Sequence, residues 1–262
     1  MKILTWNINS VRLRIQSVLR AAKKADADIL CLQETKTPDE LFPHEAFEKA
    51  GYVHRHIHGM KGYNGVAIIA RVPFHAEAIH HRVGREDCRH IAASFKGFEL
   101  HNLYIPAGGD IPDPDLNEKY KHKLDFVDEM TRWFGDAYKP THKLVAVGDF
   151  NIAPYEHDVW SHKQLLDVVS HTPAETTRLN AMRDSLGWVD AGRHFVPMDQ
   201  KLYTWWSYRN KDWKKSNRGR RLDHIWVTSP LKKSLAEHNV MAETRDWQQP
   251  SDHVPVVVKL AT

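Results

Sequence analysis

Amide and carboxylate side chains recur where three apolar runs of the sequence end. Asn7 and Asn9 follow the first run, Glu34 follows the second, and Asp149 and Asn151 follow the third. Taken alone, each of them has an ordinary alternative as a loop-capping residue. Oxygen donors at three separate strand ends, however, are the set that a hard cation such as Mg²⁺ prefers together with a phosphate group. The pattern therefore indicates a metal site suited to phosphate chemistry.

A second chemical signal stands directly before the last apolar run, where Asp252 and His253 are adjacent. Histidine exchanges protons near neutral pH, so such a pair can serve in proton transfer. A surface histidine preceding a strand is the plain alternative. Neighbours in an extended segment point in opposite directions, so both side chains reach one site only if the segment is a loop. On that condition we expect Asp252 to face the metal.

Aromatic and basic residues alternate through positions 202–221. Trp205, Trp206, Tyr208 and Trp213 are interspersed there with lysine and arginine. Aromatic faces beside cationic groups suit a sugar or base next to a phosphate backbone. A tryptophan pair on a strand is also common in protein cores, and we expect Trp206 to face away from Trp205.

Short apolar runs and helical patterns show how these residues would be positioned. We expect buried strands at 2–6, 29–32, 66–70, 90–95, 100–105, 144–147, 222–228 and 254–260. Amphipathic helices are expected at 11–19 and 116–134. Strands and helices alternate at the start of the chain and strands follow one another in the middle, which favours two mixed sheets flanked by helices. Residues 106–115, rich in proline and glycine, are expected to form a functional loop.

Length and composition are those of an ordinary globular protein. The chain has 262 residues, 42% hydrophobic and 27% charged, with a formal charge of +4. We expect one domain over 1–262, and a mildly basic surface that permits a nucleic-acid partner. The two cysteines, Cys31 and Cys88, are far apart, and no apolar stretch of 18 residues occurs. These features predict reduced thiols, no membrane association and a cytoplasmic location.

Six motifs in order make the interpretation more specific. The segments LTWNINSVR, LQETK, NLYIPAG, GDFNIAP, RGRRLDH and SDHVPV span residues 4–256. In sequence and spacing they resemble the endonuclease/exonuclease/phosphatase superfamily, and within it the exonuclease III and apurinic/apyrimidinic endonuclease family. The resemblance implies an α/β four-layer sandwich, with two packed mixed β-sheets flanked by helices.

The resemblance also implies roles at the reactive centre. His253 would be the catalytic histidine and Asp223 the carboxylate that orients it. Asp149 would orient or deprotonate the attacking water, with Asn151 fixing that water or a phosphate oxygen, and Tyr104 would donate to a phosphate oxygen. Which of Asp149, His253 and Tyr104 is the base stays open. The remaining residues are expected to hold Mg²⁺, with Mn²⁺ as a substitute: Glu34, assisted by Asn7, Asn9 and Asp252.

Contacts with DNA follow from the same resemblance. Trp205 and Leu222 would line a pocket for a flipped-out abasic sugar, with Trp213 on a nearby loop. The positions that match backbone contacts are Lys61, Tyr63 and Arg89, and for Lys61 a solvated basic surface is an equal alternative. Arg220, in the basic stretch beside the pocket, is also expected to contact DNA. The sequence departs from its relatives there, since some carry an aromatic residue at that position, and at Ala107, where many carry a polar side chain.

The expected function is that of a DNA-repair nuclease of the bacterial cytosol or nucleoid. It would cleave duplex DNA 5′ to abasic sites and degrade it 3′→5′ from 3′ ends, as a monomer with no obligate protein partner. One alternative is a superfamily phosphodiesterase or phosphatase acting on RNA, lipid or inositol phosphate. Another is a non-catalytic DNA-binding relative, although every ligand and dyad position is present in the sequence.

Overall fold

Two six-stranded sheets form the centre of the molecule in the computed structural model, which describes residues 1–210 and 212–261. The first sheet has the strand order β13-β14-β1-β2-β4-β3. Its strands are β1 Lys2–Asn7, β2 Ile29–Gln33, β3 His54–His58, β4 Val66–Ala70, β13 Leu235–Val240 and β14 Val256–Leu260. Within it, β1 and β2 are parallel and the other pairs are antiparallel.

The second sheet has the order β5-β6-β7-β8-β12-β9. Its strands are β5 Phe74–Ile79, β6 His90–Phe95, β7 Phe98–Tyr104, β8 Leu144–Asp149, β9 Val189–Asp190 and β12 Asp223–Val227. Here β7 and β8 are the parallel pair. Both sheets are therefore mixed, as the sequence predicts.

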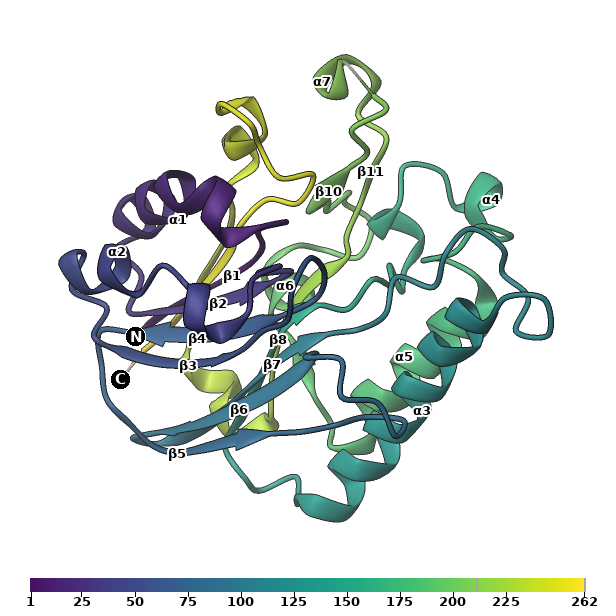
Figure 1. The fold of residues 1–262 in the computed structure, drawn as a ribbon. Coiled ribbons are helices and arrows are strands. Elements are labelled where there is room, and N and C mark those ends of the chain that lie inside the picture. The colour runs from purple at the N-terminus through teal and green to yellow at the C-terminus, as the bar shows by residue number, and fades with distance from the viewer. Residues whose placement is uncertain (211, 262) are drawn as a thin grey trace.

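Helices cover the outer faces of both sheets (Figure 1). Helix α1 Val11–Ala25 packs on the first sheet, with α2 His44–Lys49 beside it, and α3 Glu118–Ala137 and α5 Pro173–Ser185 pack on the second. Shorter helices lie in the connections: α4 His162–Leu165, α6 Ala191–Phe195 and α7 Trp213–Ser216. None of the helices in the described residues is long and apolar enough to cross a membrane. The four layers confirm the predicted fold class.

Alternating side chains along each strand explain this layering. Ile3, Ile68, Leu100 and Val145 face inward and form the core between the sheets. Their sequence neighbours face outward against the helices, as Leu4 does against α1. Burial of each such aliphatic side chain stabilises the fold by roughly 1.5–3 kcal/mol, so the sheet-to-sheet core fixes how the strand ends are positioned.

A small antiparallel pair projects from one end of this sandwich. It consists of β10 Trp205–Trp206 and β11 Gly219–Arg220, with α7 at its tip (Figure 1). We call residues 205–220 the arm. Trp205 also forms an isolated bridge with His253, which joins the base of the arm to the residues that precede β14.

Six strands have no counterpart among the predicted ones, the two-residue strands β9, β10 and β11 and the longer β3, β5 and β13, and one helix starts later than predicted. β3 consists mainly of half-buried polar residues, and β5 and β13 contain exposed residues, so none of the three gives an apolar run. The helix expected from 116 begins at Glu118, because Asn117 is its N-cap and its side chain accepts a hydrogen bond from the Lys119 amide.

Candidate active site

The polar strand ends of both sheets meet at one end of the sandwich. Asn7 ends β1 in the first sheet and Asp149 ends β8 in the second. The Asn7 side-chain Nδ2 donates to Glu34 Oε1 at 2.8 Å and to Asp149 Oδ2 at 2.9 Å. One buried amide thus joins carboxylates from the two sheets and fixes their separation.

His253 lies between two carboxylates at this end. Its Nδ1 donates to Asp223 Oδ2 at 2.8 Å, and its Nε2 is 3.6 Å from Asp149 Oδ2. Asp223 pairs with Asp149 across β12 and β8, and its Oδ2 also accepts from Thr204 Oγ1 at 2.6 Å. His253 precedes β14, where Ser251 Oγ donates to the Asn7 carbonyl at 2.7 Å. This connection brings the C-terminal dyad to the end of β1.

Burial and charge shift the proton affinities of this group. Burial alone lowers the pKa of His253, but the charges of Asp223 and Asp149 outweigh it and raise that pKa to about 10. Burial raises the pKa of Asp149 to about 7, against the opposing charge of His253. At neutral pH His253 is therefore a proton donor, while Asp149 is poised to exchange a proton.

Lys36, a residue without a predicted role, holds Glu34 in its ionised form. Burial raises the pKa of Glu34, but Lys36 and the Asn7 amide together lower it below its ordinary value. Lys36 Nζ is 2.7 Å from Glu34 Oε2 and donates to Asn9 Oδ1 at 2.7 Å. Glu34, Lys36 and Asn9 all have positive φ angles, a conformation that clusters at functional sites. The only signal in the sequence is the position of Lys36 two residues after Glu34.

The two remaining polar groups of the centre make hydrogen bonds that fix their orientation. Tyr104 donates its hydroxyl to Glu34 Oε1 at 2.8 Å, and burial raises its pKa well above the ordinary value, so it keeps its proton at neutral pH. Asn151 donates its backbone N–H to Asp149 Oδ1 and its Nδ2 to Asp149 Oδ2, at 2.9 and 3.0 Å. Asn151 thereby orients the carboxylate of Asp149.

The carboxylates of this centre are better placed than its amides to bind a hard cation. Asp149, Asp223 and His253 bring ligand atoms within 4.8 Å of one another, and Asn7 holds Glu34 beside them. Carboxylate oxygens are the donors that such cations prefer. The amide oxygens of the expected ligands Asn7 and Asn9 are instead engaged, by the Asn9 backbone N–H and by Lys36.

Asp252, the fourth expected metal ligand, instead lines a cavity that opens beside His253. Its Oδ2 accepts from Trp205 Nε1 at 3.0 Å. The segment around it is a loop rather than a strand, which allows Asp252 and His253 to line the same cavity.

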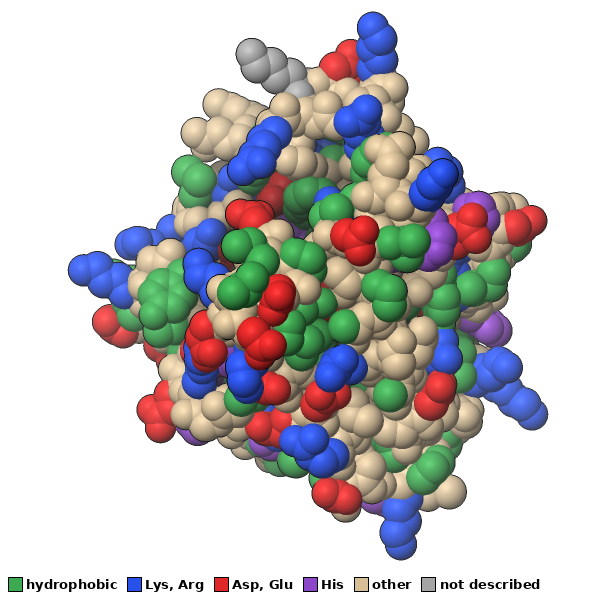
Figure 2. Space-filling model, turned by 90° about the vertical axis from the view of Figure 1, so that its right-hand side faces the viewer, with side chains coloured by type: hydrophobic (Ala, Val, Ile, Leu, Met, Phe, Trp, Pro, Cys, Tyr) green, Lys and Arg blue, Asp and Glu red, His purple; other side chains and the backbone are tan. Residues whose placement is uncertain are grey.

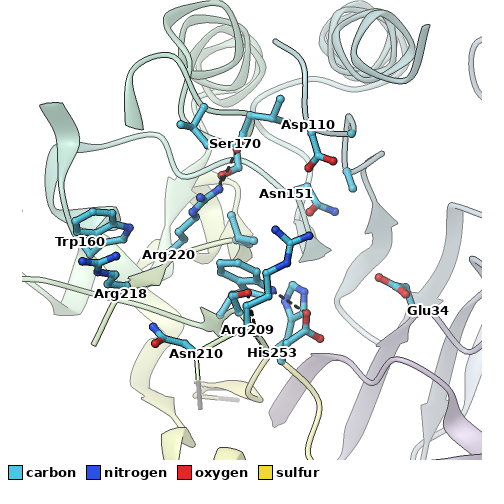
Figure 3. A pocket seen from close by; sticks show the side chains of 18 residues that line it. Glu34, Asp110, Asn151, Trp160, Ser170, Arg209, Asn210, Arg218, Arg220 and His253 are labelled. Carbon is cyan, nitrogen blue, oxygen red and sulfur yellow. Dashed lines mark hydrogen bonds between the residues drawn. The ribbon is translucent and has the colours of Figure 1, made fainter. Parts of the chain in front are cut away.

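A cavity of about 680 Å³ opens beside His253. Trp205 and Leu222 line it, as the resemblance implies. Ala107, from the expected functional loop, and Arg209 and Arg218, from the aromatic and basic stretch, also line it, whereas Trp160 and Ser170 come from segments with no predicted role. Figure 3 shows Arg218 lying against Trp160 and Arg209 extending into the cavity. The volume suits a sugar or a nucleotide.

The other residues expected to contact DNA lie in different settings. Lys61 and Tyr63 are exposed on the loop between β3 and β4. Arg89 is half-buried, forms an ion pair with Asp87 and lies over the ring of Tyr104 at 4.8 Å, so it braces the reactive centre.

The aromatic residues of the arm divide between cavity and packing. Trp206 faces away from Trp205 and is buried against Tyr203 and Val254. Trp213 packs on Trp206 with ring centroids 5.0 Å apart, and its Nε1 donates to Asp246 at 3.1 Å. Trp213 therefore does not line the cavity.

The arm also carries a concentration of positive charge, from Arg209, Lys214, Lys215 and Arg218. Figure 2 shows Lys and Arg side chains gathered at the top of the face that it views, where the arm projects, and mixed acidic and basic residues below. A cationic arm next to a cavity is the arrangement expected for a surface that follows a phosphate backbone.

Comparisons with known proteins agree with this geometry. The family model described as Endonuclease/Exonuclease/phosphatase family matches residues 4–253. Exodeoxyribonuclease III of Haemophilus influenzae is 28% identical, with 98% of each chain covered.

Solved structures extend the similarity to the whole fold. An AP endonuclease from Archaeoglobus fulgidus superposes with a TM-score of 0.93 at 32% identity, with both chains fully covered. A 3′ phosphatase from Neisseria, solved with a product DNA hairpin, gives 0.91 at 32% identity and the same coverage. The chain therefore belongs to the endonuclease/exonuclease/phosphatase family, in its exonuclease III and AP endonuclease branch.

Proposed function

We propose that this protein is a Mg²⁺-dependent DNA-repair nuclease that cleaves duplex DNA 5′ to abasic sites and removes nucleotides from 3′ ends. The observation that carries the proposal is the buried Asp223–His253–Asp149 array beside a cavity flanked by a cationic arm. The array suits hydrolysis of a phosphate ester, and the cavity suits the sugar attached to that phosphate. The activities of the related nucleases support this assignment.

In this mechanism a water molecule attacks phosphorus and the bond to the 3′ oxygen breaks. Asp149, oriented by Asn151, accepts a proton from the water, since its carboxylate lies next to His253, which binds the phosphate. His253 carries a proton on each ring nitrogen at that pH and donates from Nε2 to a phosphate oxygen. Asp223 holds the ring in place through Nδ1 and stabilises its charge.

Glu34 and Asp149 are the carboxylates that would hold the metal ion, with Asn7 setting their spacing. We propose Mg²⁺ because both are oxygen donors, and Mn²⁺ can substitute in such a set. When bound, the ion neutralises charge that develops on the phosphate oxygens. Tyr104 remains protonated and directs Glu34 through its hydroxyl.

An abasic sugar is the proposed occupant of the cavity between Trp205 and Leu222. Extrusion from the duplex costs least where no base has to be unstacked, which favours abasic sites over intact nucleotides. We propose that the protein acts as a monomer on DNA.

Cleavage of two labelled duplexes tests this function. One duplex carries a single tetrahydrofuran abasic analogue, and the other is intact with recessed 3′ ends; each is incubated with Mg²⁺ or with EDTA. The expected result is a Mg²⁺-dependent nick 5′ to the analogue and 3′→5′ shortening of the intact duplex. If neither duplex is cut while a soluble phosphoester is hydrolysed, the proposed substrate is wrong.

A 3′-phosphatase activity is a second candidate because of the similarity to the Neisseria enzyme. A duplex that ends in a labelled 3′-phosphate distinguishes it. Release of inorganic phosphate with no change in strand length would assign this activity.

A further inference from the structure

Arg220 places a guanidinium group without a counter-charge in the wall of the cavity. Its NH1 donates to the Val169 carbonyl at 2.9 Å and to Ser170 Oγ at 2.7 Å (Figure 3). Its Nε is buried and has no hydrogen-bond partner, and NH2 forms no hydrogen bond to any described residue. No carboxylate of residues 1–210 and 212–261 lies within 4.0 Å of this side chain. NH2 is therefore the donor group that is available to a ligand, while the buried Nε stays unsatisfied.

This arrangement is unfavourable for the protein alone and favourable for an anion. Burial lowers the pKa of Arg220, and the nearest charge that opposes this effect, Glu175, forms no ion pair with it. Arg220 is half-buried and lies over the ring of Trp205 at 5.3 Å, so its charge is only partly balanced, and an anion that enters the cavity completes that balance. The free NH2 group is held in a fixed plane by the hydrogen bonds of NH1, and its N–H groups suit the oxygens of a phosphate group.

Strand pairing fixes where Arg220 lies relative to the reactive centre. Trp205 pairs with Arg220 on one side and forms a bridge with His253 on the other. Neighbouring strands are spaced by about 4.8 Å, so the backbones of His253 and Arg220 are separated by roughly 10 Å, with Trp205 between them. All three side chains line the same cavity. A nucleotide whose 5′-phosphate is at His253 and whose sugar lies on Trp205 therefore directs its 3′ side toward Arg220.

Two more arginines make this wall of the cavity cationic. Arg218 lies over the ring of Trp160 at 4.7 Å, and Arg209 extends into the cavity. Within the described chain neither has a carboxylate within 4.0 Å, although Asp110 lines the cavity as well. Arg220 is the most enclosed of the three and the one held by fixed hydrogen bonds. It is therefore the group best prepared to recognise one particular phosphate.

We propose that Arg220 binds the phosphate on the 3′ side of the nucleotide in the cavity, so that substrates with this phosphate are preferred over those that end in a 3′-hydroxyl. The inference rests on the proposed function, because it assumes that the scissile phosphate lies at His253. The phosphate belongs either to the continuous strand after an internal abasic site or to a 3′-phosphorylated end. Arg220 thereby sets the balance between endonuclease and exonuclease activity.

Three duplexes that share one scissile bond test this role. One has an internal tetrahydrofuran analogue, one ends in the same analogue with a 3′-hydroxyl, and one ends in it with a 3′-phosphate. With a 5′ label, cleavage on the 5′ side of the analogue gives a product of the same length from all three duplexes. Removal of only the terminal phosphate gives a longer product, which still contains the analogue. The ratio of kcat/KM for the two terminal duplexes then isolates the contribution of the phosphate.

We expect the wild-type protein to prefer the 3′-phosphate duplex by roughly 10- to 100-fold, as for a charge-assisted hydrogen bond. Arg220→Met should bring this ratio close to one, and Arg220→Lys, which keeps the charge without the planar guanidinium group, should give an intermediate ratio. Arg132→Met, which removes an exposed arginine from α3, is the matched control and should keep the wild-type ratio.

Other outcomes would overturn the inference. A wild-type ratio near one contradicts it, and so does an equal loss on both terminal duplexes in Arg220→Met, which would mark Arg220 as a support for residues 169–170 alone. If the wild-type protein cleaves none of the duplexes, the proposed function fails. The affinities for the two terminal duplexes, measured by fluorescence anisotropy in EDTA, then test the role of Arg220 independently of cleavage. Equal affinities overturn this role, and a preference for the 3′-phosphate duplex that is lost in Arg220→Met supports it.

Discussion

A single histidine offsets the charge of two buried carboxylates at the reactive centre. His253 contacts Asp223 at 2.8 Å and is 3.6 Å from Asp149, and it stays protonated because of both. In the proposed mechanism, the same contacts that raise its pKa make it a donor to a phosphate oxygen. At the scale of residues, stability and catalysis therefore depend on the same charge balance.

Substitution of His253 by alanine tests that dependence. We expect His253→Ala to lower the single-turnover cleavage rate by about 10²–10⁴-fold, while anisotropy in EDTA shows DNA binding within a few-fold of wild type. His75→Ala, at an exposed position of β5, serves as control. Near-normal turnover in His253→Ala would remove this residue from the mechanism.

Glu34 gives a second test, directed at the metal. In Glu34→Gln the side chain keeps its shape and can still accept from Asn7, but it loses the charge that pairs with Lys36 and a cation. Loss of a residue that only hydrogen-bonds a metal ligand weakens metal binding by roughly 10–100-fold. Because Glu34 is a proposed ligand itself, we expect the Mg²⁺ concentration for half-maximal cleavage to rise by at least this factor. A large fall in Tm with unchanged Mg²⁺ dependence would instead identify Glu34 as a structural residue.

Elements buried on both faces are the ones that the sequence predicts best. β4 and β6 have the predicted bounds, because their side chains pack between the sheets on one face and against other elements on the other. β3, β5 and β13 are edge strands with half-buried or exposed polar residues, so no apolar run marks them. The strand-end residues Asn7 and Asp149 were predictable for the same reason as the buried strands that they end.

The cavity was less predictable because loops far apart in sequence build it. Trp160 and Ser170 reach it from the connections around α4, and no local pattern marks them. The hydrogen bonds of Arg220 to residues 169 and 170 depend on that same connection. Which polar groups are free in the cavity is a property of tertiary structure, so the sequence predicts Arg220 as a DNA contact but not which phosphate it faces.

A buried ion pair connects the outer helices to the active-site loops. Lys123 of α3 contacts Glu175 of α5 at 2.5 Å with both side chains fully buried, and it donates to the Asn151 carbonyl at 2.8 Å. We expect Lys123→Met to reduce the free energy of unfolding by about 3–5 kcal/mol, because Glu175 is left as an unpaired buried charge. Equilibrium urea denaturation measures this loss.

The double variant is the control for this pair. Removal of both charges in Lys123→Met/Glu175→Gln should restore part of the stability. The losses of unfolding free energy in the two single variants should therefore add up to more than the loss in the double variant. Strictly additive losses would show that the two groups do not interact energetically.

At the scale of the whole molecule, a set of buried histidines makes the fold sensitive to acid. His80, His90 and His101 lie together between the second sheet and Trp133 of α3. His90 Nε2 is 3.0 Å from His101 Nδ1, and Arg82 donates to His90 Nδ1, which leaves the proton of neutral His90 on Nε2. The donation from Arg82 and its positive charge favour a hydrogen-bonded neutral cluster over a metal site.

His101 allows the acid sensitivity to be measured. Burial, with the charges of His80 and Arg82, lowers its pKa from 6.5 to about 3, so between these values the unfolded chain binds a proton that the folded protein excludes. Its contribution to stability is therefore present above pH 6.5 and is lost as the pH falls, by about 1.36 kcal/mol per unit, or about 2 kcal/mol between pH 6.5 and 5. We expect the free energy of unfolding of His101→Phe, from urea titrations at pH 7.5, 6 and 5, to decline less steeply than that of wild type. Groups outside the cluster, Asp149 among them, titrate in both proteins and cancel in the difference, whereas His90, whose pKa the charge of His101 also lowers, contributes to the same change of slope. His75→Phe, at an exposed position, should keep the wild-type slope, and an unchanged slope in His101→Phe would show that this histidine takes up its proton without unfolding.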